Sequence, residues 1–437
     1  MNGLAEVLLW GSRVGAVALP NGERVATFEY DPAFAESGVE LSPLEMPLAA
    51  SRRHRFPGLS PESFEGLPGL LADSLPDRYG SALIDAWLAT QDREPGSFDA
   101  IERLCYIGRR GMGALEFRPA TGPRPTKSHA IDVAALAELA AEVMAQRSDL
   151  LASLSRPGRE EALKEILRVG TSAGGARPKA LIALNPATGE VRSGQLDVDA
   201  GFEHWILKFD GVEDKTRDLG ASRGYGAIEL VYAQLATRAG IEMTACRLLE
   251  ENGRRHFMTR RFDRTDGGEK LHMQSLAALA HLDYRQPGAN SYEQAFQAIR
   301  RLELPRAAVE QQFLRMTFNV VARNQDDHVK NVAFLMSRDG RWSLSPAFDV
   351  VYAYNPRGRW TSAHQMSING KRDEITLRDL RQVAELASIK RSKSDELVQR
   401  VVEAVADWPK LASEARIDED RIVRIQRSHR LDRVCRR

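Results

Sequence analysis

The sequence predicts a mixed α+β and α/β fold of two lobes, with a small β-rich subdomain at the N-terminus and a mainly helical lobe at the C-terminus. Strand-like runs fill the first thirty residues and recur between 179 and 264, whereas apolar residues at helical spacing dominate the rest. The 437 residues are enough for two or three packed units. Hydrophobic residues make up 43% and charged residues 28%, which is typical of a globular protein and excludes extensive disorder.

The N-terminal part predicts a β-meander followed by helices. Short apolar runs at 6–10, 14–19 and 24–30 are separated by turn residues. Leucines at helical spacing follow between 60 and 88. The segment 119–125 holds three prolines and a glycine, which is typical of a linker. We therefore expect an N-terminal subdomain over residues 1–125.

The rest of the chain divides into a strand-rich and a helical part. An Ala- and Leu-rich helix is predicted over 132–155, and strands over 179–184, 204–209 and 256–264. A helix at about 225–238 ends before Gly240, as helices commonly do. Beyond 265 the pattern is helical except for a strand-turn-strand unit at 332–344. These features predict a nucleotide-binding lobe over 126–265 and a helical lobe over 266–437.

Overall composition and cysteine use exclude several classes of protein. Lys plus Arg number 61 against 60 for Asp plus Glu, so the body of the chain is not a basic nucleic-acid binder. The three cysteines form no CxxC pair, which argues against a zinc site or a disulfide framework. No run of about eighteen apolar residues occurs, so no membrane span is predicted. A cytoplasmic protein that does not bind membranes fits this composition.

The C-terminal tail is an exception to the neutral balance. Residues 421–437 contain seven arginines and one acidic residue, Asp432. Six of these arginines recur every three residues and would wind around a helix without forming one stripe. The pattern is compatible with a solvated helix, and also with contact to DNA phosphates or to a protein partner.

The most informative motif is N-Q-D-D-H-V-K-N at 324–331, followed by F-D-V at 348–350. Asp326 and Asn331 have the Asp-x4-Asn spacing of a protein-kinase catalytic loop, in which Asp positions the hydroxyl and Asn binds metal. Asp349 comes after a predicted hairpin, where a second metal-binding carboxylate is needed. Each piece alone also fits an ordinary polar turn or strand end. The combination favours phosphoryl transfer.

Two further features precede that loop in the order a kinase requires. Residues 170–175 contain three glycines and lie just before a predicted strand, so their backbone amides could approach phosphates closely. The segment does not fit the G-x-x-x-x-G-K-[ST] pattern of P-loop enzymes, and a flexible loop remains an alternative. Lys208 ends an apolar strand, where it could reach phosphates or extend into solvent. Glu229 on the following helix is its predicted partner.

Together these motifs carry a family resemblance. The segments G-T-S-A-G-G-A-R-P-K-A at 170–180, I-L-K at 206–208, R-R-F-D-R at 260–264, R-N-Q-D-D-H-V-K-N at 323–331 and P-A-F-D-V at 346–350 resemble the HipA-type serine/threonine kinases, which are toxins of toxin-antitoxin modules. The opening meander and L-P-G-L-L-A-D-S-L-P-D at 67–77 resemble the N-terminal subdomain of that family. The expected fold is therefore protein-kinase-like.

The resemblance implies a role for each matching residue. Asp326 would be the catalytic base, and Asn331 and Asp349 would bind Mg²⁺. The residues implied in ATP binding are Gly174, Gly175, Ala176, Arg177, Lys179, Lys208, Glu229, Arg260, Phe262, His328, Lys330, Asn331 and Asp349. In this family a serine of the glycine loop is autophosphorylated, which inhibits the kinase; Ser172 matches it, with Thr171 as an adjacent rival. A phosphate there would repel the phosphates of ATP.

Two positions depart from the family pattern. Asp327 stands where a small residue is common, so the choice of Asp326 as base depends on its spacing to Asn331. Arg260 replaces an acidic residue at the start of the segment expected to hold adenine.

The resemblance further implies an ATP- and Mg²⁺-dependent protein kinase that phosphorylates a translation component such as an aminoacyl-tRNA synthetase. Its expected partner is a HipB-like helix-turn-helix antitoxin, through which any contact with DNA would be indirect. Two alternatives share the same residues. One is a weakly active kinase fold that serves as a co-repressor with the antitoxin, and the other is a kinase for a small molecule.

Overall fold

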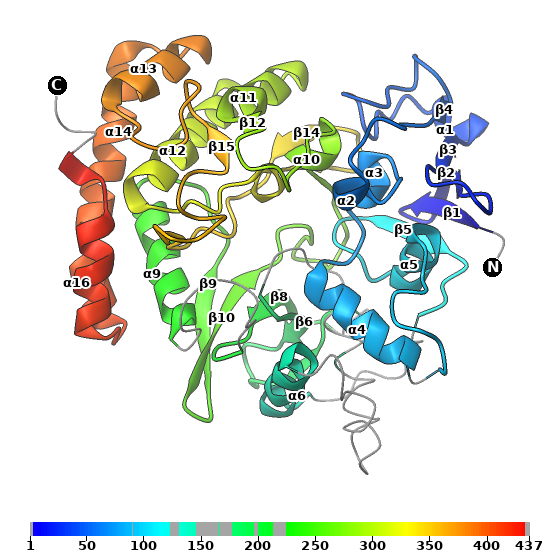
Figure 1. The fold of residues 1–437 in the computed structure, drawn as a ribbon, viewed down its shortest axis with the longest axis horizontal. Helices are drawn as coiled ribbons and strands as arrows, with labels where there is room; N and C mark the ends of the chain where they lie inside the picture. The colour runs from blue at the N-terminus through cyan, green and yellow to red at the C-terminus, as the bar shows by residue number, and fades with distance from the viewer. Residues whose placement is uncertain are drawn as a thin grey trace.

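The computed structural model describes residues 3–89, 91–122, 131–145, 166, 177–195, 200–212 and 224–432. The N-terminal strands lie on one side of the molecule and the last helices on the opposite side (Figure 1). A second sheet lies in the lower part of this view, with helices α4 and α6 beside it and α9 along its other side. In the described residues no helix is long and apolar enough to cross a membrane.

The N-terminal sheet has five antiparallel strands in the order β4-β3-β2-β1-β5. Its strands are β1 (Leu4–Leu9), β2 (Ser12–Ala18), β3 (Thr27–Tyr30), β4 (Arg53–His54) and β5 (Leu115–Arg118). The predicted meander is confirmed as β1, β2 and β3. β5 was not predicted from the sequence: it is four residues long and pairs with β1 across more than a hundred residues of chain.

The second sheet is also antiparallel, in the order β7-β6-β8-β10-β9. Its strands are β6 (Lys179–Leu184), β7 (Val191–Ser193), β8 (Glu203–Lys208), β9 (Cys246–Glu251) and β10 (Arg254–Arg260). The predicted strands at 179–184 and 204–209 correspond to β6 and β8. The third was predicted to run to 264 but ends at Arg260, because the buried Asp263 binds Arg261 and Arg264 in a turn.

Helices predominate over strands in the C-terminal half. The longer ones are α9 (Tyr225–Arg238), α11 (Tyr292–Arg301), α12 (Arg306–Ala322), α13 (Leu377–Leu386), α14 (Arg391–Ala406), α15 (Trp408–Glu414) and α16 (Glu419–Ser428). The prediction of a helix at 225–238 is confirmed by α9. Gly226 lets this helix approach β10, since a Cβ at that position would lie 2.3 Å from the Arg255 carbonyl oxygen.

Further strands and helices complete the fold. The predicted strand-turn-strand unit is confirmed as β13 (Ala333–Met336) and β14 (Trp342–Leu344), which join β11 (His272–Ser275) in a three-stranded sheet. β12 (Asn290–Ser291) pairs with β15 (Met366–Ser367). The remaining helices are α1 (Pro32–Ala35), α2 (Pro61–Phe64), α3 (Gly69–Ala72), α4 (Arg78–Ala89), α5 (Ala100–Ile107), α6 (Val133–Ala145) and α10 (Leu276–Leu279).

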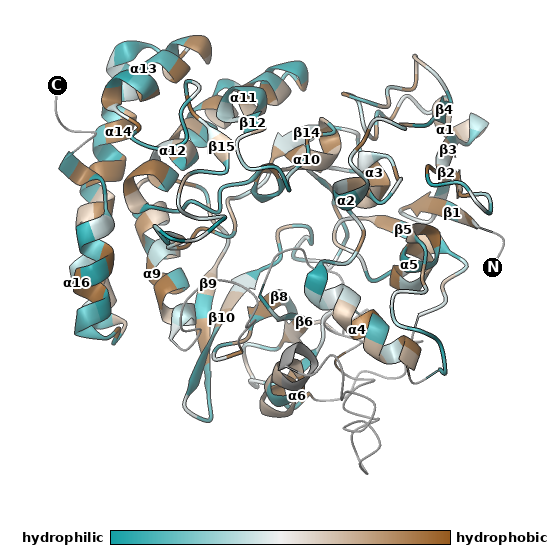
Figure 2. Ribbon diagram, in the orientation of Figure 1, coloured by the Kyte–Doolittle hydropathy of each residue, from teal (hydrophilic) through white to brown (hydrophobic). Residues whose placement is uncertain are grey.

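Three hydrophobic clusters hold these elements together. One lies in the N-terminal sheet, one between α4, α6 and the second sheet, and the largest among the C-terminal helices. α4 therefore packs with the second sheet, although it belongs to the predicted subdomain 1–125, and α9 packs with the C-terminal helices. β1 and α10 consist largely of hydrophobic residues, whereas α13 and α16 contain many hydrophilic ones (Figure 2). The domain boundaries at 125 and 265 stay predictions.

The start of α13 gives a stability prediction. Burial alone would raise the pKa of Asp379, but hydrogen bonds from Thr376, Lys371 and Asn369 lower this pKa to about 2. An Asp with a depressed pKa stabilises the fold above its unfolded pKa of about 3.9, and this stabilisation is lost as the pH falls toward 2. Asp379→Asn should lower the free energy of unfolding at pH 7 by about 1–2 kcal/mol, allowing for solvent screening of Lys371.

Urea unfolding at pH 7 and at pH 3 measures this effect. The difference between wild type and Asp379→Asn should shrink at the lower pH. Glu396→Gln is the control, because Glu396 forms only an exposed pair with Lys393. An equal loss of unfolding free energy in the two variants would contradict the stabilising role of Asp379 at the start of α13.

Candidate active site

The predicted catalytic loop begins where α12 ends. Arg323, with a φ of 59°, terminates the helix in the left-handed conformation. The chain then passes through Asp326 to a 3-10 turn, η1 (Val329–Asn331). Asn331 Nδ2 donates to the Asp326 carbonyl oxygen over 2.9 Å and so closes the loop. The two ends of the predicted Asp-x4-Asn motif are therefore in contact.

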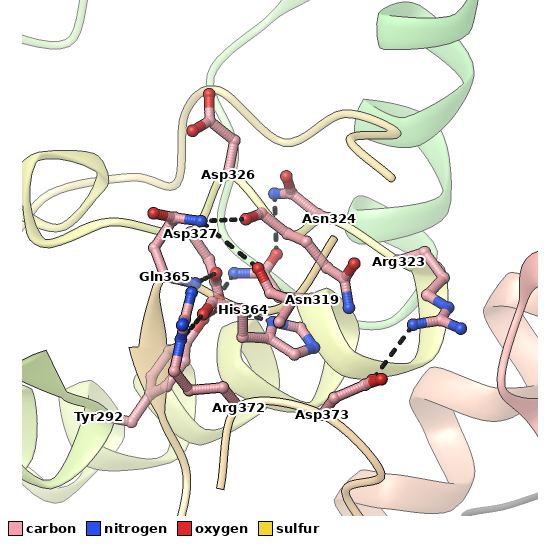
Figure 3. Close-up of polar contacts among 12 residues, drawn as sticks. Tyr292, Asn319, Arg323, Asn324, Asp326, Asp327, His364, Gln365, Arg372 and Asp373 are labelled. Atoms are coloured by element: carbon pink, nitrogen blue, oxygen red, sulfur yellow. Dashed lines mark hydrogen bonds and ion pairs between the residues drawn. The ribbon is translucent and has the colours of Figure 1, made fainter. Parts of the chain in front are cut away.

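The two neighbouring acids have different environments. Asp327 is buried and accepts hydrogen bonds from Tyr292 Oη over 2.7 Å and from the Gln365 backbone amide over 2.8 Å; its Oδ2 also lies 2.8 Å from His364 Nδ1. Asp326 is half-buried, and its carboxylate accepts no hydrogen bond from the described residues. Its carboxylate points away from the Asp327 cluster (Figure 3). Asp327 thus holds the loop, and Asp326 is left available for a ligand.

The hydrogen-bond network continues from this cluster to the predicted metal-binding segment. Asn319 Nδ2 donates to Tyr292 Oη over 2.9 Å, and Asn324 Nδ2 donates to Asn319 Oδ1 over 3.0 Å and more weakly to the Asp349 carbonyl oxygen over 3.4 Å. The loop is thereby tied to α11, to α12 and to the backbone at Asp349. Sequence reasoning missed Tyr292 and Asn319, which lie on helices and belong to no motif.

Lys208 is the centre of a buried charge cluster. Its Nζ lies 2.5 Å from Glu229 Oε1 and also pairs with Asp349 Oδ1. The predicted partnership of Lys208 with Glu229 is confirmed. Burial would lower the pKa of Lys208, but Asp349 and Glu229 raise it, so this lysine stays charged. Burial raises the pKa of Glu229, and Lys208 opposes that rise.

Asp349 lies where the β13–β14 hairpin returns to the catalytic loop. Its φ of 52° lies in the left-handed region. The ring of the preceding residue, Phe348, packs on that of Phe262, with the ring centroids 5.4 Å apart. Burial would raise the pKa of Asp349, but Lys208 and Lys179 lower it to about 2. This carboxylate is therefore ionised at neutral pH and available as a cation ligand.

Asn331 and Asp349 line the same cavity, together with His328 and Asn324. Because Asn331 Nδ2 donates to Asp326, its Oδ1 is left to accept or to coordinate. The described residues contain no group of three or more His, Cys, Asp or Glu side chains suited to a metal. Mg²⁺ is commonly held by one or two protein oxygens plus phosphate oxygens, so the pair fits that ion when a nucleotide supplies the rest.

Cationic groups gather beside this cavity. Lys179 lies opposite Lys208 in the β6–β8 pairing, which puts both side chains on one face of the sheet. The Arg177 guanidinium lies 3.4 Å from the ring centroid of Tyr225, at the start of α9. Gly174, Gly175 and Ala176 lie outside the described residues, as do Thr171 and Ser172.

The Lys330 side chain comes from the catalytic loop. Its Nζ lies 4.7 Å from the ring centroid of Tyr284. The ring centroid of His328 lies 6.1 Å from the same centroid. His328 and Lys330 therefore extend to one side of the loop, next to a tyrosine that sequence reasoning did not single out.

The segment expected to hold adenine offers one backbone donor. The amides of Arg260 and Arg261 donate to the carbonyl oxygens of Ala245 and His204, both over 2.9 Å. The Phe262 amide makes no hydrogen bond to any residue that the structure describes. The Arg260 guanidinium forms a surface ion pair with Asp266 over 2.9 Å. Its charge is therefore compensated by an acid of the same chain.

The two-lobed fold, the strand lysine with its helical glutamate, and the Asp-x4-Asn loop followed by Asp349 define a protein-kinase-like α+β protein. The family model of the HipA-like C-terminal domain matches residues 171–408, more than half of the chain, and that of the HipA N-terminal domain matches residues 5–118. The chain belongs to the HipA family.

A solved structure shows the same fold. HipA of Shewanella oneidensis MR-1, in a complex with HipB and operator DNA, is 18% identical, with a TM-score of 0.68 over 97% of this chain and 95% of the other. The predicted fold class is thereby confirmed. The Helicobacter pylori proinflammatory kinase CtkA is 12% identical, with a TM-score of 0.31 over 51% of this chain and 92% of the other. A search of curated proteins gave no match.

Proposed function

We propose that this HipA-family protein is an ATP- and Mg²⁺-dependent protein serine/threonine kinase. The observation that supports this most strongly is the pairing of Lys208 with both Glu229 and Asp349, beside a catalytic loop whose Asp326 carboxylate is left available. Active protein kinases need the strand lysine paired with a helical glutamate, and they also need the metal-binding aspartate in place.

Each group has a defined task in this proposal. Asp326 accepts the proton of the acceptor hydroxyl, and the Asp327 cluster keeps it in place. Lys208 and Lys179 neutralise phosphate oxygens from one face of the sheet. Asn331 and Asp349 would hold Mg²⁺, which offsets the charge on the transferred phosphoryl group.

Labelled ATP tests the proposal directly. Purified protein with [γ-³²P]ATP and Mg²⁺ should label itself at Ser172, as the family resemblance implies. Ser172→Ala should lose most of the label, and label retained in that variant but lost in Thr171→Ala would identify Thr171 as the acceptor. Wild-type protein that incorporates no phosphate under any Mg²⁺ concentration would overturn the proposal.

We further propose a toxin role with a HipB-like helix-turn-helix antitoxin as partner. HipA of Shewanella oneidensis, which has the same fold, was solved with HipB and operator DNA, and this supports the proposal. Any contact of our protein with DNA would then pass through the antitoxin. A translation component such as an aminoacyl-tRNA synthetase is the proposed substrate.

A further inference from the structure

The segment joining α3 to α4 in the N-terminal subdomain contacts the second sheet (β7-β6-β8-β10-β9), which we call the nucleotide-binding sheet because the proposed function places ATP there. Asp77 Oδ2 lies 3.7 Å from Lys179 Nζ, and the two side chains are 9% and 3% exposed. The other carboxylate oxygen of Asp77 accepts from the Gly80 amide over 2.7 Å and so fixes the side chain at the start of α4. Asp77 is therefore a rigidly held acid beside a buried lysine.

The same segment also contacts the catalytic lobe. Asp73 accepts hydrogen bonds from the Ser275 amide over 2.6 Å and from Ser275 Oγ over 2.8 Å. Its Oδ1 lies 3.9 Å from Lys330 Nζ. Two acids only four residues apart thus reach a lysine on the nucleotide-binding sheet and a lysine on the catalytic loop.

A second part of the N-terminal subdomain contacts the segment between the lobes. The Gly113 amide donates to Asp263 Oδ2 over 2.7 Å, and Glu116 pairs with Lys270 over 2.9 Å. The subdomain therefore contacts the sheet, the catalytic lobe and the chain that connects them.

The positive charge of Lys179 requires a compensating acid. Lys179 lies opposite Lys208, so two ammonium groups share one face of the sheet. Lys208 has Glu229 and Asp349 at contact distance. Burial disfavours a charged lysine, and among the residues that the structure describes Asp77 forms an ion pair that compensates for the charge of Lys179.

We propose that the N-terminal subdomain completes the nucleotide site: Asp77 is a positioning residue that holds Lys179 toward the ATP phosphates, and Asp73 holds Lys330 on the opposite lobe. This inference rests on the proposed kinase function and adds the subdomain to the catalytic unit.

Equilibrium binding of fluorescent ATP and adenosine analogues to the full chain with Mg²⁺ tests the proposal. Asp77→Asn should weaken ATP binding about tenfold, the effect expected for loss of one charge-assisted contact, and change adenosine binding less than about twofold. Asp77→Glu should restore part of the ATP affinity. Asp99→Asn is the matched control, because Asp99 caps α5 of the same subdomain and pairs with no lysine of the described residues.

A double-mutant cycle keeps the test valid if Asp77→Asn folds poorly. Lys179→Gln combined with Asp77→Asn removes both members of the buried pair. Its ATP affinity should equal that of Lys179→Gln alone, because Asp77 acts through Lys179. Additive losses would overturn the proposal.

Two other outcomes separate this inference from the kinase function. ATP binding by wild type with no change in Asp77→Asn would overturn the role of Asp77 and leave the kinase function standing, as would equal losses for ATP and adenosine. No ATP binding by folded wild-type protein would overturn both.

Discussion

Asp326→Ala should abolish phosphoryl transfer while the protein stays folded. A general base typically contributes about 10²–10⁴ in rate, so turnover should fall at least a hundredfold. Since the Asp326 carboxylate accepts no hydrogen bond within the described chain, the thermal unfolding midpoint should change little. Initial rates of ³²P incorporation and a thermal melt measure both quantities.

Asp327→Ala is the matched comparison at the adjacent position. It removes the acceptor of Tyr292 Oη and of the Gln365 amide, and the partner of His364. Buried donors without an acceptor cost about 1–3 kcal/mol each, so this variant should unfold at a clearly lower temperature. A large loss of activity without loss of stability in Asp327→Ala, with Asp326→Ala still active, would reverse the assignment.

Lys208→Met should have the second large effect, on stability and nucleotide binding together. It leaves Glu229 and Asp349 close to one another in a mostly buried site, without the ammonium group that pairs with both. Breaking a buried ion pair costs about 3–5 kcal/mol, so the urea midpoint should fall strongly. ATP binding should be lost as well, because the phosphate-contacting ammonium is gone.

The double variant Lys208→Met/Glu229→Gln separates the two effects. Removing the stranded Glu229 charge should restore part of the stability. It should restore no ATP binding, because the lysine itself is needed. Recovery of ATP affinity in the double variant would show that Lys208 acts only as a structural partner of Glu229.

Sequence reasoning succeeded where the chemistry is local or follows chain order. The Asp326–Asn331 contact depends on six consecutive residues. A lysine that ends a strand, followed by an apolar helix that contains a glutamate, was enough to pair Lys208 with Glu229. The β13–β14 hairpin was also predicted, because its turn residues Asp339 and Gly340 interrupt two short apolar runs.

Contacts set by tertiary packing were not predictable. Asp77 and Lys179 lie about a hundred residues apart in different units, and no spacing rule connects them. The environments of Asp326 and Asp327 differ only because Tyr292, His364 and Gln365 reach one of them. β9 was missed because its residues are only partly buried and do not alternate.

Phosphopeptide mass spectrometry after brief expression tests the central claim, that this protein transfers phosphate to protein hydroxyls. Cells expressing wild type should contain serine- or threonine-phosphorylated peptides of a translation component, such as an aminoacyl-tRNA synthetase, and of the Ser172 region. Cells expressing Asp326→Ala at equal abundance should lack them. Identical phosphopeptide profiles for the two proteins, with both folded, would contradict a protein kinase and favour a co-repressor or a small-molecule kinase.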